Sequence, residues 1–118
     1  MRTRLVSLTA ALALAGLATS PAHAQVEIQW WHSMGGALGE WVNDLAKDFN
    51  ATQTQYRIVP TFKGSYDESM TAAIAAFRSG NAPHILQVFE VGTATMMASR
   101  NAIVPVGQIM KDAGVRFD

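Results

Sequence analysis

Four polar side chains in predicted loops of this 118-residue chain could bind or transform a small molecule. Glu90 follows an apolar run, and its carboxylate can accept hydrogen bonds. Tyr66 lies beside a predicted helix start, where a phenol suits an anionic or hydroxylated ligand. His32 and Ser33 place an imidazole next to a hydroxyl. These residue types point to two chemistries, which are ligand binding without turnover and nucleophilic hydrolysis.

Hydrolysis is the weaker interpretation. Adjacent loop residues such as His32 and Ser33 rarely adopt the geometry of a base and its nucleophile, and no serine lies in a G-x-S-x-G turn. The histidines and acids show no metal-ligand spacing such as H-x-x-x-H, and the chain has no cysteine. We therefore expect no catalytic residue, metal or cofactor. A small exported hydrolase that uses His32, Ser33 and Glu90 remains the alternative from another class.

Glu90 and Tyr66 each have a structural interpretation as well. Glu90 could complement the dipole of the short helix that it precedes, and this role is as consistent with the residues as ligand binding. Surface packing is favoured for Tyr66 on the same basis. Trp30 and Trp31 are adjacent and must point to opposite faces of a strand. One of them is then expected in the core, and the other could form a stacking wall in a binding site.

Residues 1–24 have the three zones of a secretory signal peptide. Arg2 and Arg4 form a basic start, residues 5–17 are almost wholly apolar, and a small-residue A-x-A pattern ends at Ala24. We expect cleavage after Ala24 and export of the remainder. The apolar run is shorter than the roughly 20 residues of a membrane-spanning helix, and no later segment is long and apolar enough.

Removal of the predicted signal peptide leaves 94 residues with seven basic and nine acidic side chains, a net charge of −2. No basic patch remains that could neutralise a run of phosphates, so we expect no nucleic-acid binding. Without disulfides, an exported chain of this size must rely on its apolar core.

Strand-like and helical segments alternate along this part. Strands are predicted at 26–30, 56–62 and 84–89, and helices at 38–49, 66–79, 93–99 and 108–113. This order predicts an α/β fold of three layers, in which helices cover a mainly parallel sheet. Ligands of such sheets bind beyond the carboxyl ends of the strands, which places the candidate site in loops 31–36, 63–66 and 90–93.

Three local signals refine this prediction. Ser65 and Glu68 match the capping box at a helix start, and Gly80 suits the position after a helix end. Pro60 indicates an edge strand or a strand end, because proline cannot donate to a sheet ladder. The apolar run at 84–89 is typical of a buried central strand.

Several runs of the sequence resemble a known family. They are WHSM at 31–34, AAFRSGNAP at 75–83 and EVGTATMMAS at 90–99. They are similar to the N-terminal part of the periplasmic receptors that bind sn-glycerol-3-phosphate for ABC importers, within the class of extracellular solute-binding proteins. The resemblance covers about residues 26–118.

This resemblance implies two α/β lobes that close around glycerol-3-phosphate or a related phosphodiester, and permease subunits in the inner membrane as partners. It implies that residues 25–118 are the N-terminal portion of the first lobe, because members are several hundred residues long. Tyr66 and Glu90 match two ligand-binding positions of the family, and Trp31, His32 and Ser33 are candidates to line the cleft. A receptor for another sugar or polyol phosphate is the alternative within the class.

Overall fold

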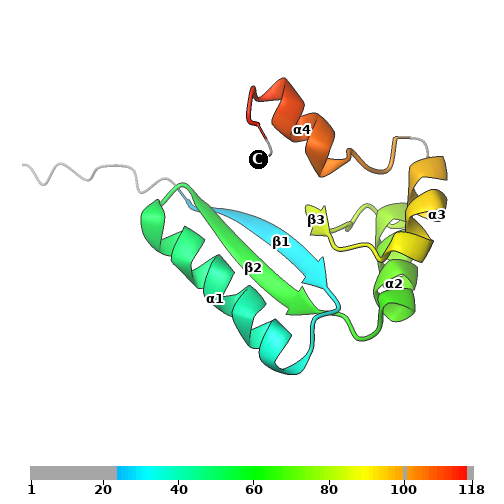
Figure 1. The fold of residues 1–118 in the computed structure, drawn as a ribbon, viewed down its shortest axis with the longest axis horizontal. Coiled ribbons are helices and arrows are strands. Elements are labelled where there is room, and N and C mark those ends of the chain that lie inside the picture. The colour runs from blue at the N-terminus through cyan, green and yellow to red at the C-terminus, as the bar shows by residue number, and fades with distance from the viewer. Residues whose placement is uncertain (1–23, 100, 117–118) are drawn as a thin grey trace, which may run out of the picture.

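The computed structural model describes residues 24–99 and 101–116 (Figure 1). Two longer strands and two longer helices come first, and short elements follow. The elements are β1 (Val26–His32), α1 (Gly36–Thr52), β2 (Tyr56–Phe62), α2 (Tyr66–Arg78), β3 (Ile85–Leu86), the 3₁₀ turn η1 (Glu90–Gly92), α3 (Thr93–Ala98) and α4 (Val106–Asp112). The alternation of strands and helices that the sequence predicts is therefore confirmed.

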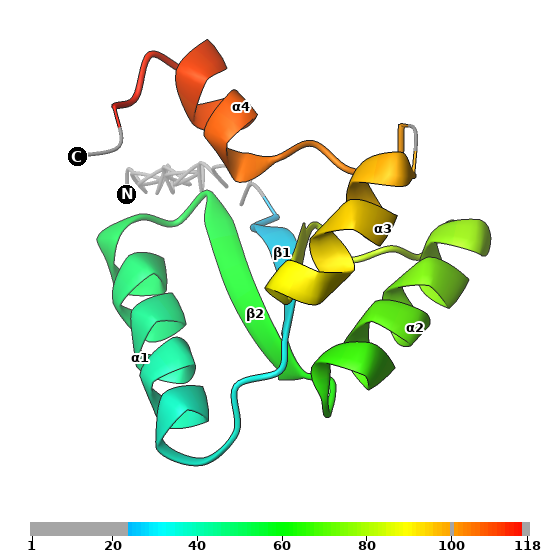
Figure 2. The ribbon, with the colours of Figure 1, turned by 45° about the vertical axis from the view of Figure 1, so that its right-hand side comes forward.

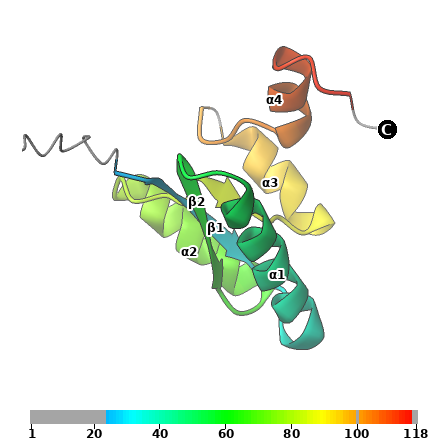
Figure 3. The same ribbon diagram turned by 90° about the vertical axis from the view of Figure 1, so that its left-hand side faces the viewer.

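The strands form a parallel sheet in the order β2-β1-β3. β1 is central and pairs with β2 from Val26↔Tyr56 to His32↔Phe62. The first crossover runs from β1 to β2, and the second returns from β2 past β1 to β3, so the two cross the sheet in opposite directions. Right-handed connections then place their helices on opposite faces of the sheet. Figures 2 and 3 show this arrangement, with α1 on one side of the sheet and α2 on the other. The predicted three-layer α/β architecture is confirmed, as is the edge position of Pro60 in β2.

Both ends of α2 follow the sequence signals. The Ser65 N–H donates to Glu68 Oε2 at 2.7 Å, and the Glu68 N–H donates to Ser65 Oγ at 3.3 Å, which completes the capping box. Hydrogen bonding of the carboxylate by the Ser65 N–H, and then by the Ser65 side chain, lowers the pKa of Glu68. At the other end, Gly80 has a φ of 76°, and the N–H of Asn81 bonds back to the Ala76 carbonyl, as in a Schellman motif.

The buried face of α1 agrees with the sequence pattern at one residue. The apolar residues at 38, 41, 42, 45 and 49 predict the core face, and Val42 is buried, but Trp41 is 61% exposed and the other three are exposed as well. Gly39 and Ala46 face the core beside Val42. Small residues let the helix approach closely: a Cβ atom at Gly39 would lie 2.7 Å from the Met34 carbonyl oxygen. Helix periodicity identified the apolar stripe, but the helix packs on the edge of that stripe, where Val42 lies beside small residues.

The third strand also differs from the prediction. β3 has only two residues, and among the described residues it pairs with β1 alone, so it lies at an edge of the sheet instead of its centre. Ile85 is accordingly exposed. The first predicted loop is shorter than expected, because β1 continues through Trp31 to His32.

The predicted signal peptide lies outside the described residues, except for Ala24. Within the described ranges, no helix combines the length and the apolar character that crossing a membrane requires.

Candidate functional site

A hollow of about 430 Å³ lies beyond the carboxyl end of the sheet, between the first turns of α2, the segment after β3 and α3. The residues that line it come from these three places: Ser65, Tyr66, Asp67, Met70, Val88, Phe89, Val91, Gly92 and Thr95. Its position agrees with the general rule that parallel sheets bind ligands beyond their carboxyl ends. Two of the three predicted loops, 63–66 and 90–93, therefore contribute to one hollow.

Tyr66 forms part of the wall through an aromatic stack. Its ring lies 4.8 Å from that of Phe89, with 20° between the planes. Gly92 allows its segment to approach α2 closely, because a Cβ atom there would lie 3.0 Å from the Met70 sulfur. The stack fixes the tyrosine ring at the first turn of α2 and links it to the segment that carries Glu90.

Glu90 directly follows Phe89 and begins η1. Its side chain is exposed, and it has no hydrogen-bond partner within residues 24–99 and 101–116. The N-cap residue of η1 is Phe89, and no side chain caps this turn. The structure therefore shows no capping hydrogen bond from Glu90. Its side chain is not among those that line the hollow, although its neighbours Phe89 and Val91 are.

The end of β1 is held from both sides. The N–H of Lys63 donates to the His32 carbonyl at 2.9 Å, and the N–H of Gln87 donates to the Trp31 carbonyl at 2.9 Å. The Ser33 N–H donates to Gln87 Oε1, also at 2.9 Å. Lys63 Nζ lies 3.9 Å from the centroid of the Trp31 ring, within cation–π distance. Trp31 and Ser33 thus lie at the end of the central strand, and neither lines the hollow.

His32 has a different environment from the other predicted residues. It is only 3% exposed, and its ring lies between those of Trp30 and Phe62, at 5.9 and 6.1 Å. The Met34 N–H donates to its Nδ1 at 3.3 Å, which requires the lone pair of an unprotonated nitrogen. Because burial disfavours the charged ring, it lowers the pKa of His32. This packing argues against a role for His32 in lining the cleft.

A serine–histidine pair is not formed either. The Ser33 hydroxyl is buried and has no partner among the described residues, and the His32 nitrogen bonds to Met34 instead. In the same part of the chain, no group of three or more His, Asp and Glu side chains could hold a metal ion.

The environment of His32 predicts that acid destabilises the fold. The unfolded chain binds a proton near pH 6.5, whereas the folded ring binds it only at lower pH. Stability should therefore be complete above about pH 6.5 and fall between that pH and the lower folded pKa, by at most about 1.4 kcal/mol per pH unit. Urea unfolding at several pH values would measure this, and the His32→Phe variant should lose the corresponding part of the dependence. An identical pH dependence in both proteins would refute the assignment.

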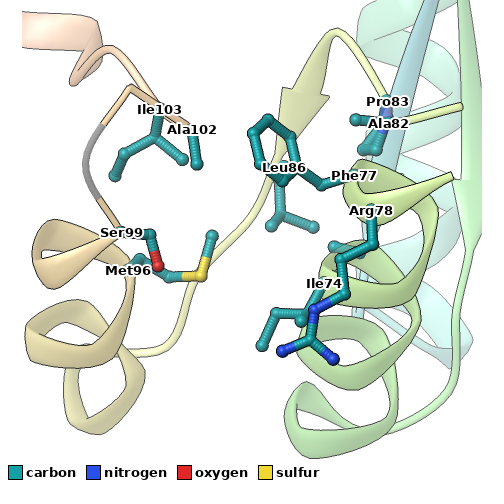
Figure 4. Close-up of a pocket in the computed structure, with 11 residues that line it drawn as sticks. Ile74, Phe77, Arg78, Ala82, Pro83, Leu86, Met96, Ser99, Ala102 and Ile103 are labelled. Carbon is teal, nitrogen blue, oxygen red and sulfur yellow. The ribbon is translucent and has the colours of Figure 1, made fainter. Parts of the chain in front are cut away.

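A second hollow, of about 290 Å³, lies between α2 and α3 near the start of β3. In Figure 4, Ile74 and Phe77 of α2 lie across the gap from Met96 and from Ile103. Its walls are mainly apolar, and the only charged side chain among its lining residues is Arg78. This hollow lacks the converging polar groups that orient a polar ligand, so we assign the site to the hollow beside Tyr66.

Sequence reasoning missed Phe89, which lines the hollow, and Gln87, which bonds to the residue after β1. The adjacency of Phe89 to Glu90 was a visible signal for the first. Gln87 gave no such signal, because it falls within the predicted strand 84–89. Lys63 lies in the predicted loop 63–66, but its contact with Trp31 was not predicted.

Comparison with known proteins identifies relatives of this chain. No protein-family model matches the chain. The sn-glycerol-3-phosphate-binding periplasmic protein of Escherichia coli O1:K1 is 56% identical over 108 residues, which are 92% of this chain and 24% of that protein. The protein of the same name from Brucella abortus strain 2308 is 50% identical over 121 aligned residues, covering 100% of this chain and 28% of that protein.

The chain thus spans about a quarter of the length of these curated relatives. Identity of this degree over nearly all of the chain is the relationship that its sequence motifs predict. In sequence, this chain is a relative of the sn-glycerol-3-phosphate-binding periplasmic proteins.

Proposed function

We propose that this chain is the N-terminal portion of the first lobe of a periplasmic substrate-binding protein, which captures sn-glycerol-3-phosphate and glycerophosphodiesters for an ABC importer. The observation that carries the proposal is the identity of 50–56% to proteins of that name. The protein would be exported with cleavage after Ala24, bind without catalysis, and deliver its ligand to permease subunits in the inner membrane.

The residues around the hollow beside Tyr66 would form one wall of the ligand-binding cleft. A second lobe would close over this wall. Glu90 would repel a phosphate, so we assign it the role of accepting hydrogen bonds from the glycerol hydroxyls. Tyr66 is a neutral donor and would bond a phosphate oxygen or a hydroxyl. The stack with Phe89 supports this role, because it orders the ring before the ligand arrives.

Tryptophan fluorescence of the full-length mature protein, titrated with glycerol-3-phosphate and with maltose, tests the ligand. Trp31 lies at the carboxyl end of the central strand, so closure should change its emission. Saturable binding of glycerol-3-phosphate alone is the expected result. Binding of maltose alone would favour a sugar receptor, and ester turnover that disappears in Ser33→Ala would favour a hydrolase.

The role of the tyrosine hydroxyl has its own test. Tyr66→Phe removes the hydroxyl and keeps a ring that can stack on Phe89. Affinity for glycerol-3-phosphate, measured by calorimetry, should fall by about 5-fold or more, because one hydrogen bond in a closed cleft is lost. Phe89→Leu is the complementary variant, which keeps the hydroxyl and removes the stack. Wild-type affinity in Tyr66→Phe would reduce the role of Tyr66 to packing.

A further inference from the structure

We propose that Gln87 is a positioning residue of this site, which fixes the segment carrying Phe89 and Glu90 against the end of β1. The inference rests on the proposed function for its effect on binding. Gln87 does not line the hollow, so it would act on the ligand through the backbone segment that it holds.

Two hydrogen bonds of Gln87 reach the end of β1 and the residue that follows it. Its N–H donates to the Trp31 carbonyl, and its Oε1 accepts from the Ser33 N–H, each at 2.9 Å. The pairing of β1 with β3 ends at Trp31↔Leu86. Gln87 therefore extends the connection by one step beyond the ladder, and its side chain replaces the backbone acceptor that a longer strand would have offered to Ser33.

The site residues follow immediately. Phe89, two residues beyond Gln87, stacks on Tyr66, and its carbonyl accepts from the Gly92 N–H to close the turn that Glu90 begins. Three residues of extended chain span only about 10 Å, so the position of Gln87 restricts that of Glu90. Gln87 is the last described attachment of this segment to the sheet before the hollow.

Gln53 provides a matched control at the opposite end of the sheet. Its Oε1 accepts from the Tyr56 N–H and its Nε2 donates to the Tyr56 carbonyl, both at 2.7 Å. Both glutamines thus bind backbone at the end of a strand, but only Gln87 does so beside the hollow. If glutamine bonds mattered only for stability, replacing either residue would have the same effect on ligand affinity.

The test compares Gln87→Met, Gln87→Glu and Gln53→Met in the full-length mature protein. Methionine keeps the length of the side chain without a strong acceptor, whereas glutamate keeps an oxygen that can accept from Ser33. Calorimetry measures affinity for glycerol-3-phosphate, and NMR measures hydrogen exchange of the Ser33 amide. Gln87→Met should weaken binding by about 2- to 10-fold and speed this exchange. Gln87→Glu should restore both, and Gln53→Met should lower the unfolding midpoint while leaving the affinity unchanged.

Wild-type affinity in Gln87→Met, or equal losses of affinity in Gln87→Met and Gln53→Met, would overturn the positioning role. If the wild-type protein does not bind glycerol-3-phosphate, the proposed function fails and the exchange rates still decide the present inference. Faster Ser33 exchange in Gln87→Met that Gln87→Glu reverses would then support it, and unchanged exchange would overturn it.

Discussion

Glu90→Ala should weaken the binding of glycerol-3-phosphate by about 5- to 150-fold in the full-length mature protein. The carboxylate is exposed with no bonding partner in the described ranges, and its neighbours Phe89 and Val91 line the hollow, so a bound hydroxyl would be its partner. In the closed cleft, alanine would leave that hydroxyl without an acceptor. Calorimetric titration of wild type and variant measures the difference.

Two further variants separate the hydrogen bond from the charge. Glu90→Gln keeps one acceptor oxygen and should lose less affinity than Glu90→Ala. Glu40→Ala removes the same charge from an exposed position on α1 and should leave the affinity unchanged. If Glu90→Ala binds as tightly as wild type and instead unfolds more easily, Glu90 stabilises the start of η1 and is not a ligand residue.

Gly39→Ala is expected to destabilise the fold by about 1–3 kcal/mol, although alanine normally favours a helix over glycine. Gly39 is buried in α1, and the new Cβ would lie 2.7 Å from the backbone carbonyl oxygen of Met34. A backbone atom cannot move aside as a flexible side chain can. Either α1 or the loop after β1 must therefore shift, and urea unfolding would report the cost.

Gly107→Ala is the matched control for this prediction. Gly107 is also a helical glycine, in α4, but no atom lies within 4 Å of a Cβ added there. Its replacement should be neutral or stabilise by up to about 1 kcal/mol. Equal effects of the two substitutions would show that close approach does not determine the choice of glycine at position 39.

Local signals in the sequence predicted the backbone well. The capping box at Ser65 and Glu68 and the glycine after α2 depend on residues within a few positions, and both have the expected geometry. Burial was predicted less well because it depends on distant contacts. Trp41 and Val42 both belong to the predicted apolar stripe of α1, yet Val42 packs inward beside Gly39 while Trp41 is exposed, and nothing in the periodicity distinguishes the two residues.

The candidate site shows the same division. The alternation of strands and helices along the chain was enough to place Tyr66 and Glu90 at one edge of the sheet, because the carboxyl ends of parallel strands meet there. Sequence could not show that His32 turns into the space between two aromatic rings, since that requires the exact end of β1. The link from Gln87 to Ser33 joins residues 54 positions apart and depends on the register of β1 and β3.

The central claim is that the hollow beside Tyr66 is one wall of a glycerol-3-phosphate site. A crystal structure of the full-length mature protein with glycerol-3-phosphate tests it most directly. The account predicts ligand density at this hollow, with a Glu90 carboxylate oxygen and the Tyr66 hydroxyl each about 2.6–3.2 Å from a ligand oxygen. A ligand bound elsewhere, with neither residue in contact, would contradict it.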